Sequence, residues 1–128
     1  MSDGRAAWLI DGNNVMGSRP DGWWRDRRGA ARALVGELAA FAAREDAPVI
    51  VVFDGAPFDV EVPDGAQLQV AFAPRRGRDA ADDEIARRVA EARDPATLRV
   101  VTSDAGLARR VRAHGAEVVP AGRFRSEL

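Results

Sequence analysis

The stretch Ala6–Asn14, which reads AAWLIDGNN, is a short apolar run that ends in an acidic residue and a glycine. Two later stretches have a similar form: Val49–Gly55 reads VIVVFDG, and Leu98–Asp104 reads LRVVTSD. Short apolar runs that stop at turn-forming residues are typical of strands buried on both faces of a parallel sheet. The three runs therefore predict parallel strands, each followed by an aspartate.

Helical patterns alternate with these runs. Apolar residues recur at the spacing of one helix face from Arg27 to Glu45 and again from Ala80 to Arg93. Leu107 and Val111 mark a third helix, with Gly115 as its C-terminal cap. Alternation of strands and helices gives right-handed crossovers and a parallel sheet covered on both faces. We therefore expect a single Rossmann-like α/β/α domain over residues 1–128, with a mostly parallel central sheet.

Two further strands complete the expected sheet. Gln67–Phe72 alternates polar and apolar residues, as an edge strand does, and Ala116–Val119 is a last short strand. The segment after the first strand is rich in polar residues, glycine and proline, and we expect a loop there as far as about Arg25. The first strand leads into Asp-Gly-Asn-Asn instead of the G-x-G-x-x-G turn of dinucleotide-binding domains.

Composition excludes several classes of function. Among 128 residues, 46% are hydrophobic and 30% charged, which suits one globular domain. Cysteine is absent and all 19 basic residues are arginine, which excludes thiol nucleophiles, Cys-ligated zinc, P-loop NTPases and Schiff-base chemistry. His114 is the one histidine, and we interpret it as a structural residue near a helix C-terminus. Without a signal peptide pattern or an apolar run of about 20 residues, we expect a cytoplasmic protein that does not enter membranes.

Aspartates are expected to gather at one edge of the sheet. Asp11, Asp54 and Asp104 follow three of the predicted strands, and ligands of open parallel sheets bind at the carboxyl ends of strands. With the common strand order 3-2-1-4-5, these carboxylates lie within several Å of one another. Like charges that close need a proton or a cation, and an all-oxygen group suits Mg²⁺ or Mn²⁺.

The helix that begins at Ala80 adds a fourth acid. Asp82 continues the apolar stripe of Ile85 and Val89, so we expect it to point toward the sheet. Asp83 is rotated by about 100° from Asp82 and precedes Arg87 by four residues, where an exposed ion pair is the ordinary outcome.

Structural interpretations of these acids stay open beside the functional one. Asp104 is a natural N-cap, Asp82 suits a capping box with Asp79, and Asp54 is an ordinary turn residue before glycine. No such cap is evident for Asp11. The conjunction of acids at one edge is a stronger signal than any one of them.

The same residues carry a resemblance to a known family. The sequence resembles the YacP-like NYN domain, a branch of the PIN-like nuclease superfamily, over nearly its whole length. The resemblance rests on IDGNNVMGSRPDGWWRDR (Ile10–Arg28), VVFDG (Val51–Gly55), ADDEI (Ala81–Ile85), VVTSD (Val100–Asp104) and HGAEVVPAGRF (His114–Phe124). It implies a PIN-like fold and a metal-dependent ribonuclease that is a hydrolase of RNA.

The resemblance also implies roles for individual residues. Asp11, Asp82 and Asp104 match the acidic core that holds Mg²⁺ or Mn²⁺, and Asp83 matches an acid found in some relatives. Asn14 matches the asparagine of the first motif, and Asp54 matches a motif position of less direct role. Asn13 departs from the pattern, which has tyrosine there, and we expect it to change the packing of the loop more than the chemistry.

Arginines and tryptophans form the expected RNA-binding surface. Trp23, Trp24, Arg25 and Arg28 lie after the first strand, and aromatic rings among arginines are typical of single-stranded nucleic-acid sites. We expect one tryptophan ring to be buried and one to be available. Arg75, Arg76 and Arg78 form a second basic group, for which a solvated charge run is the alternative, and Ser103 is a donor for an acid or a phosphate.

Two functions follow from these expectations. The first is an endoribonuclease in which an aspartate cluster with Mg²⁺ or Mn²⁺ hydrolyses RNA, with mRNA on the ribosome among the candidate substrates. The second is a non-catalytic RNA-binding module that keeps the PIN-like fold and uses the acids as caps. An aspartyl phosphatase is disfavoured, because Asp11 has no second acid two residues later and the chain has no lysine.

Overall fold

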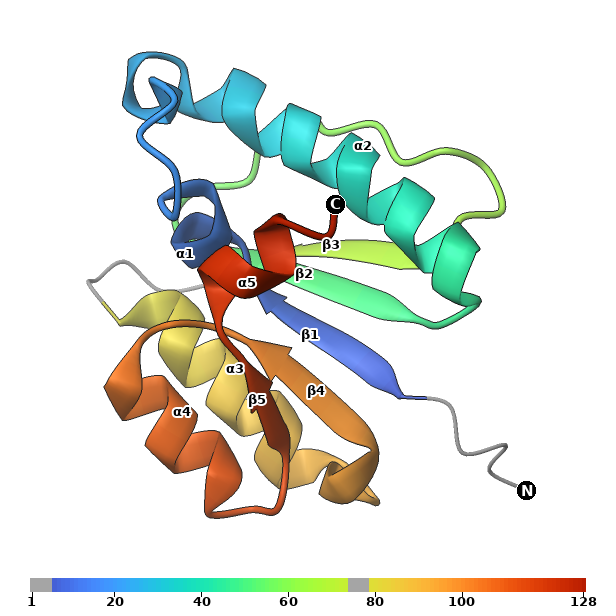
Figure 1. The fold of residues 1–128 in the computed structure, drawn as a ribbon, viewed down its shortest axis with the longest axis vertical. Helices are drawn as coiled ribbons and strands as arrows, with labels where there is room; N and C mark the ends of the chain where they lie inside the picture. Colours follow the sequence, from blue (N-terminus) through green and yellow to red (C-terminus); the bar gives the residue numbers. More distant parts are fainter. Residues whose placement is uncertain (1–5, 74–78) are drawn as a thin grey trace.

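The computed structural model describes residues 6–73 and 79–128 (Figure 1). Its centre is one all-parallel sheet with the strand order β3-β2-β1-β4-β5. The strands are β1 (Ala7–Asp11), β2 (Val49–Phe53), β3 (Leu68–Phe72), β4 (Leu98–Val101) and β5 (Glu117–Val119). The strand order expected from the sequence is confirmed, with Leu68–Phe72 as an edge strand.

Helices cover both faces of the sheet (Figure 1). Helices α1, α2 and α5 lie against one face, and α3 and α4 lie against the other. Their bounds are α1 (Gly12–Met16), α2 (Arg27–Glu45), α3 (Ala80–Glu91), α4 (Ala105–Arg112) and α5 (Ala121–Arg125), with single 3-10 turns at η1 (Trp23–Arg25) and η2 (Pro95–Thr97). The expected α/β/α architecture is therefore correct.

The alternation of side chains along β1 explains the two layers. Trp8 and Ile10 belong to the core under α1, α2 and α5, whereas Leu9 belongs to the core under α3 and α4. The Trp8 ring packs against Phe41 of α2 and Phe124 of α5, with centroids 5.1 and 5.5 Å away. Each aromatic ring buried in this way contributes roughly 1.5–3 kcal/mol, so these contacts fix α2 and α5 on the sheet.

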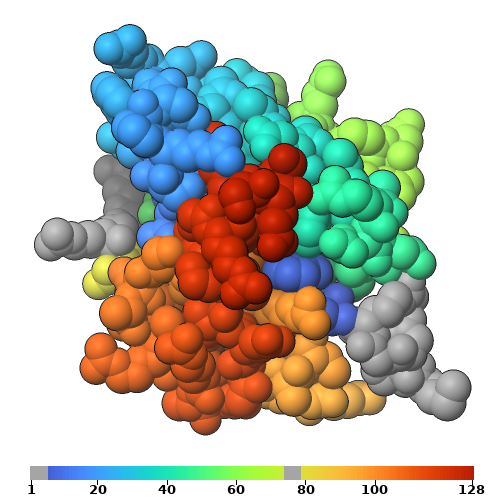
Figure 2. All heavy atoms as spheres, in the orientation of Figure 1, coloured from blue at the N-terminus to red at the C-terminus, as the bar shows by residue number. Residues whose placement is uncertain are grey.

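Two helices were not expected from the sequence. The segment after β1 contains α1 and η1, where we predicted a polar loop, and α5 follows the last strand. Both α1 and α5 have five residues, too few for a helical period to show in the sequence. In the space-filling view, α5 (red) covers the centre of one face between the segment after β1 and α4 (Figure 2). None of the helices in the described ranges is long and apolar enough to cross a membrane.

Candidate active site

Three aspartates lie at the carboxyl edge of the sheet, as the sequence predicted. Asp11 is the last residue of β1, Asp54 directly follows β2, and Asp104 is the N-cap of α4 after β4. Because β1 pairs with both β2 and β4, the three acids belong to neighbouring strand ends. The register of the sheet thus brings together residues that are far apart in the sequence.

Asp11 is the most buried acid of this edge. Its residue surface is 4% exposed, and its Oδ2 accepts a hydrogen bond of 2.9 Å from Oγ1 of Thr102. The same hydroxyl oxygen accepts a hydrogen bond of 3.1 Å from the backbone N–H of Asp104. Burial raises the pKa of Asp11 to about 7, and the nearby charge of Asp82 adds to this. Thr102, which the sequence did not single out, therefore orients the buried carboxylate and joins β1 to the loop before α4.

The residues after Asp11 hold the neighbouring loops. A Cβ atom at Gly12 would lie 2.6 Å from the ring of Phe53, so only glycine lets the chain pass this close to β2. Asn13 Oδ1 accepts a hydrogen bond of 2.8 Å from the backbone N–H of Asp54. Asn14 Oδ1 accepts one of 2.7 Å from the backbone N–H of Ser103. The Asp-Gly-Asn-Asn sequence thus ties the end of β1 to the loops on both sides.

Among the described residues, no protein donor binds the carboxylate of Asp82, in contrast to the other acids of this edge. It lies half-buried in the first turn of α3, and within residues 6–73 and 79–128 its carboxylate makes no hydrogen bond or ion pair. Burial raises the pKa of Asp82 to about 6, the charges of Asp104, Asp79 and Asp54 add to the shift, and the positive charge of Arg110 opposes it. Electrostatic coupling to Asp11, Asp54 and Asp104 places this side chain among the acids of the sheet edge. This agrees with the inward direction expected from the sequence.

Asp54 and Asp104 both serve as helix caps. Asp54 Oδ1 accepts a hydrogen bond of 2.8 Å from the backbone N–H of Ala81, in the first turn of α3. Asp104 Oδ1 accepts one of 2.8 Å from the backbone N–H of Leu107 in α4. Asp79 makes no side-chain capping bond, so the capping box with Asp82 is not formed. The capping interpretation of Asp104 is therefore correct, and it uses one of the two carboxylate oxygens.

The donor chemistry of this edge fits a hard divalent cation. Asp11, Asp82 and Asp104 offer carboxylate oxygens, and burial together with neighbouring acids raises the pKa values of Asp11 and Asp82. Within the described part of the chain, however, no three acidic or histidine side chains are close enough to hold a metal ion together. Mg²⁺ commonly binds through one or two carboxylates and several waters, so the arrangement suits a partly hydrated ion.

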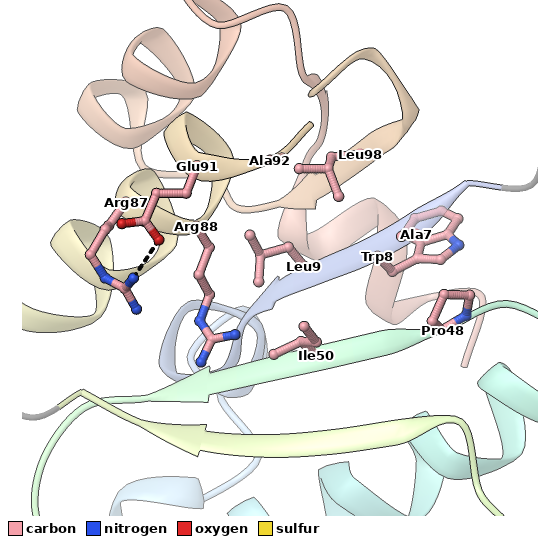
Figure 3. Close-up of a pocket in the computed structure, with 10 residues that line it drawn as sticks. All are labelled: Ala7, Trp8, Leu9, Pro48, Ile50, Arg87, Arg88, Glu91, Ala92 and Leu98. Carbon is pink, nitrogen blue, oxygen red and sulfur yellow. Dashed lines mark hydrogen bonds and ion pairs between the residues drawn. The ribbon is translucent and has the colours of Figure 1, made fainter. Parts of the chain in front are cut away.

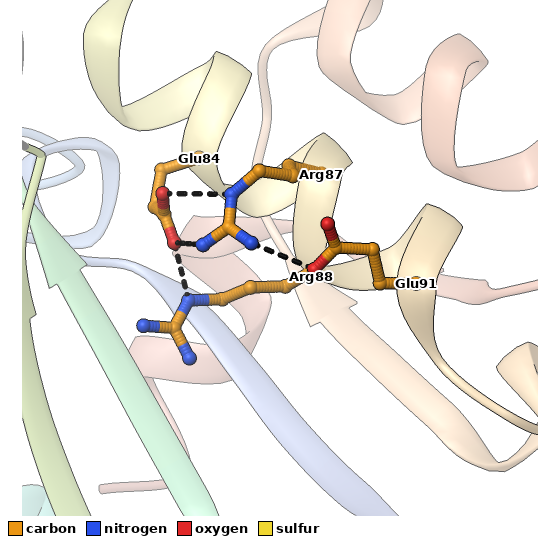
Figure 4. A network of polar contacts seen from close by, with 4 residues as sticks. All are labelled: Glu84, Arg87, Arg88 and Glu91. Carbon is orange, nitrogen blue, oxygen red and sulfur yellow. Dashed lines mark hydrogen bonds and ion pairs between the residues drawn. The ribbon is translucent and has the colours of Figure 1, made fainter.

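Ion pairs fix the helix that carries Asp82. Glu84 is buried and receives hydrogen bonds from Arg87 and Arg88, and Arg87 also pairs with Glu91 at 2.7 Å (Figure 4). Burial would raise the pKa of Glu84, but the hydrogen bonds from the two arginines outweigh it and hold that pKa below its usual value. One face of α3 is thus anchored by charges.

The expected pair between Asp83 and Arg87 is wrong. Asp83 Oδ1 instead accepts a hydrogen bond of 2.9 Å from Nη1 of Arg110, which belongs to α4. The physical reason is competition, because Glu84 and Glu91 bind the guanidinium of Arg87 from the same helix. Asp83 therefore joins α3 to α4, and Asp82 keeps the place nearer the other acids.

The two tryptophans divide as the sequence predicted. Trp23 is half-buried and packs against the core, whereas Trp24 is 48% exposed. The guanidinium of Arg25 lies 5.9 Å from the centre of the Trp24 ring. Arg28 turns to another aromatic side chain, with its guanidinium 5.4 Å from the Phe58 ring. The exposed ring and its arginine remain the candidate surface for stacking a base.

Arg125 of α5 binds the end of α1 and the loop before Trp23, a role that the sequence analysis missed. Its Nη1 donates to the carbonyl oxygens of Val15 and Met16, at 3.1 and 2.9 Å, and its Nη2 pairs with Asp21 at 3.0 Å. These carbonyls end α1, where a helix leaves acceptors without internal partners. The signal in the sequence is weak, because donor and acceptors are more than 100 residues apart.

Four further candidate residues remain: three arginines and Ser103. Arg75, Arg76 and Arg78 lie outside the described residues. Ser103 is exposed, and its Oγ accepts a hydrogen bond of 2.9 Å from the backbone N–H of Ala121. Ser103 thus caps the start of α5, and we find no acid bound to its hydroxyl among the described residues.

Two hollows lie at opposite ends of the strands. One has a volume of about 390 Å³ and is lined by Asn13, Asp54 and the start of α2. The other, of about 330 Å³, is lined by Trp8, Ile50, Leu98 and the end of α3, at the amino ends of the strands (Figure 3). The first hollow is beside the aspartates, and the second is remote from them.

Comparisons with known proteins agree with this architecture. A family model described as the YacP-like NYN domain matches residues 8–128. Two crystal structures of Rae1 (YacP) from Bacillus subtilis, one of a mutant, match the fold with TM-scores of 0.73 and 0.71. They are 24% and 23% identical to this chain, and the matches cover 95% and 94% of it and 74% and 72% of theirs. None of the curated proteins compared matches the sequence.

Proposed function

The chain belongs to the YacP-like NYN domain family, and we propose that it is a metal-dependent endoribonuclease acting at the carboxyl edge of its sheet. One observation carries the proposal. The carboxylate of Asp82 makes no hydrogen bond or ion pair within the described residues, yet it is half-buried and interacts electrostatically with the buried Asp11. Burying a carboxylate without a hydrogen bond lowers the stability of the fold. We therefore attribute the position of Asp82 to a function of this site.

Asp11, Asp82 and Asp104 would hold Mg²⁺ or Mn²⁺, one or two of them by direct contact and the rest through waters bound to the ion. When bound, such an ion supplies charge stabilisation for the phosphoryl oxygens and lowers the pKa of a water molecule. The chain's own residues supply position: Thr102 orients Asp11, and the cap of α4 fixes Asp104. Asp54, which caps α3 from the loop after β2, and Asp83, in the first turn of α3, are the candidates for orienting water at the rim.

The proposed substrate is RNA with a single-stranded stretch. The exposed Trp24 ring and the neighbouring Arg25 are suited to a base and a phosphate, respectively. Both follow α1, which begins directly after Asp11, so the candidate binding surface is close in the chain to the aspartates. Attack by water needs no nucleophilic side chain, in agreement with a chain that has no cysteine.

A non-catalytic RNA-binding module is the second candidate. It is favoured by the capping bonds of Asp54 and Asp104, which give two of the acids a structural role. In that case the acids would stabilise the starts of α3 and α4, and RNA would bind without being cut.

A metal titration separates the two candidates. Purified protein is melted with EDTA, Mg²⁺ or Mn²⁺, and a labelled single-stranded RNA is incubated under the same conditions. The endoribonuclease is expected to gain several degrees in Tm with Mn²⁺ and to cut RNA internally only when the ion is present. Asp82→Asn should lose both effects, and Asp94→Asn, which changes an exposed aspartate of the loop before η2, should keep them. RNA binding without cleavage, together with a Tm that Mn²⁺ does not change, would establish the binding module instead.

A further inference from the structure

A pocket beside the aspartates has the composition of a nucleotide site. The hollow of about 390 Å³ lies between the first turn of α2 and the loop after β2. Its floor is formed by Met16, Ala31 and Phe53, which are buried. Arg28 and Phe58 line its side. The pocket therefore combines an apolar floor with an aromatic ring and positive charge.

The ring of Phe58 is held in place by its neighbours. It packs against the Phe72 ring of β3, with centroids 5.3 Å apart, and the guanidinium of Arg28 lies 5.4 Å from its centre. Arg32 lies 5.5 Å from the same ring and donates a hydrogen bond of 3.1 Å to the carbonyl oxygen of Asp59. These contacts fix the loop after β2 against α2, so the aromatic wall is preformed and half-exposed.

Asp54 connects the pocket to the candidate active site. It lines the pocket, and its carboxylate also caps α3 one residue before Asp82. Asn13 lines the pocket as well, and its Oδ1 is used by the backbone of Asp54. Within the described residues no acceptor binds the amide N–H groups of Asn13, so they can donate to a ligand on this wall. A chain that passes the aspartates can thus place an adjacent group in the pocket.

We propose that this pocket binds the base of an RNA nucleotide adjacent to the phosphate that is cleaved, with Phe58 as the stacking surface and Arg27 and Arg28 as the phosphate contacts. The inference rests on the proposed function, because that function supplies the cleaved phosphate. The chemistry favours a nucleotide, because a flat apolar base needs an aromatic wall and its phosphate needs arginine. The hollow in Figure 3 is a poorer candidate for this nucleotide. It lies at the amino ends of the strands, away from the aspartates, and its Arg88 is already paired with Glu84.

Binding of short single-stranded RNA tests the proposal. Fluorescence anisotropy with a labelled ten-nucleotide RNA in EDTA gives the Kd, and a gel shows that the RNA stays intact. Phe58→Leu, which keeps apolar volume and removes the ring, should weaken binding by about tenfold, and Phe58→Tyr should restore it. Arg28→Gln should weaken binding and lower the slope of log K against log salt by about 0.7. Arg112→Gln, an exposed arginine on α4, is the matched control and should leave that slope unchanged.

Abasic substitutions in the RNA identify the base itself. One abasic nucleotide is moved along the RNA, and the position that fits the pocket should lose about tenfold in affinity for the wild-type protein. The same substitution should cost Phe58→Leu almost nothing, because the stacking partner is already gone. Thermal melting checks that each variant is folded. If Phe58→Leu does not fold, the salt slope of Arg28→Gln decides, since that side chain is exposed.

The outcomes separate this inference from the proposed function. If Phe58→Leu and Arg28→Gln bind every RNA as the wild type does, while the wild type cuts RNA with Mn²⁺, the pocket is not a base site and the nuclease proposal stands. If the abasic effect depends on Phe58 but no metal supports cleavage, the pocket binds a base and the nuclease proposal fails. Absence of RNA binding by the wild type overturns both.

Discussion

Replacing the most buried acid should stabilise the metal-free protein in a pH-dependent way. Asp11→Asn keeps an oxygen that can accept the hydrogen bond from Thr102, but it removes a carboxylate whose pKa burial raises from 3.8 to about 7. Between these two values the unfolded state releases a proton that the folded state retains. Stability of the wild type therefore falls as pH rises from about 4 to about 7, and the asparagine variant escapes this loss.

The pKa shift of Asp11 sets an upper limit on the stability that its ionisation removes. One pKa unit corresponds to about 1.4 kcal/mol, so ionisation of Asp11 destabilises the fold above pH 7 by at most about 4 kcal/mol. Between pH 5 and pH 7 the loss is at most about 3 kcal/mol. For a chain of 128 residues this is a change in Tm on the order of 10 °C.

Thermal melting in EDTA at pH 5 and pH 8 measures this difference. The Tm advantage of Asp11→Asn over the wild type should grow between these pH values, and Mn²⁺ at pH 8 should reverse it by stabilising the wild type alone. Asp94→Asn, an exposed substitution, should show no such growth. A variant that is less stable than the wild type at both pH values by the same amount would refute the reasoning, because the carboxylate would then act only as a hydrogen-bond acceptor.

Three further predictions follow from single contacts. Asp82→Ala should lose at least about 100-fold in single-turnover RNA cleavage and Asp83→Ala about tenfold or less; a larger loss at Asp83 would show that the wrong face of α3 was assigned. Trp24→Ala should weaken RNA binding by about tenfold without changing Tm, whereas Trp23→Ala should lower Tm; equal affinity of Trp24→Ala and wild type would remove the exposed ring from the RNA site. Arg125→Ala should lower the free energy of unfolding in urea by about 2–3 kcal/mol, and an unchanged midpoint would mean that the carbonyls of α1 are satisfied by water.

Local patterns were sufficient to predict the sheet. The apolar runs before Asp11 and Asp104 gave buried parallel strands, and the strand order common in such folds, which we assumed, is the one observed. The stripe of Ile85 and Val89 gave the direction of Asp82. Helices α1 and α5 escaped prediction because a five-residue helix spans little more than one turn.

Contacts between distant parts of the chain could not be predicted in this way. The hydrogen bond from Thr102 to Asp11 joins residues 91 positions apart, and Asp83 finds its arginine on α4 although Arg87 is four residues away. The helical i, i+4 rule identifies residues that can pair, but not which of several acids binds a given arginine. Here Glu84 binds Arg87 in place of Asp83. Metal binding and RNA cleavage stay predictions until the experiments above are done.

The partners of the four acids divide the site into a fixed frame and one unsatisfied group. Asp11, Asp54 and Asp104 each have an oxygen held by a protein donor, so their positions do not depend on a ligand. The Asp82 carboxylate has no such donor among the described residues, and the charges of Asp104, Asp79 and Asp54 outweigh that of Arg110 on it. A rigid frame lowers the entropy that a bound cation would have to remove. Burial and repulsion of these charged carboxylates destabilise the metal-free protein, and a bound cation would recover part of that free energy. By linkage, a substitution that stabilises the metal-free fold at this edge should weaken metal binding by a comparable amount, so the gain in Tm of Asp11→Asn in EDTA and its loss of Mn²⁺ affinity should change together.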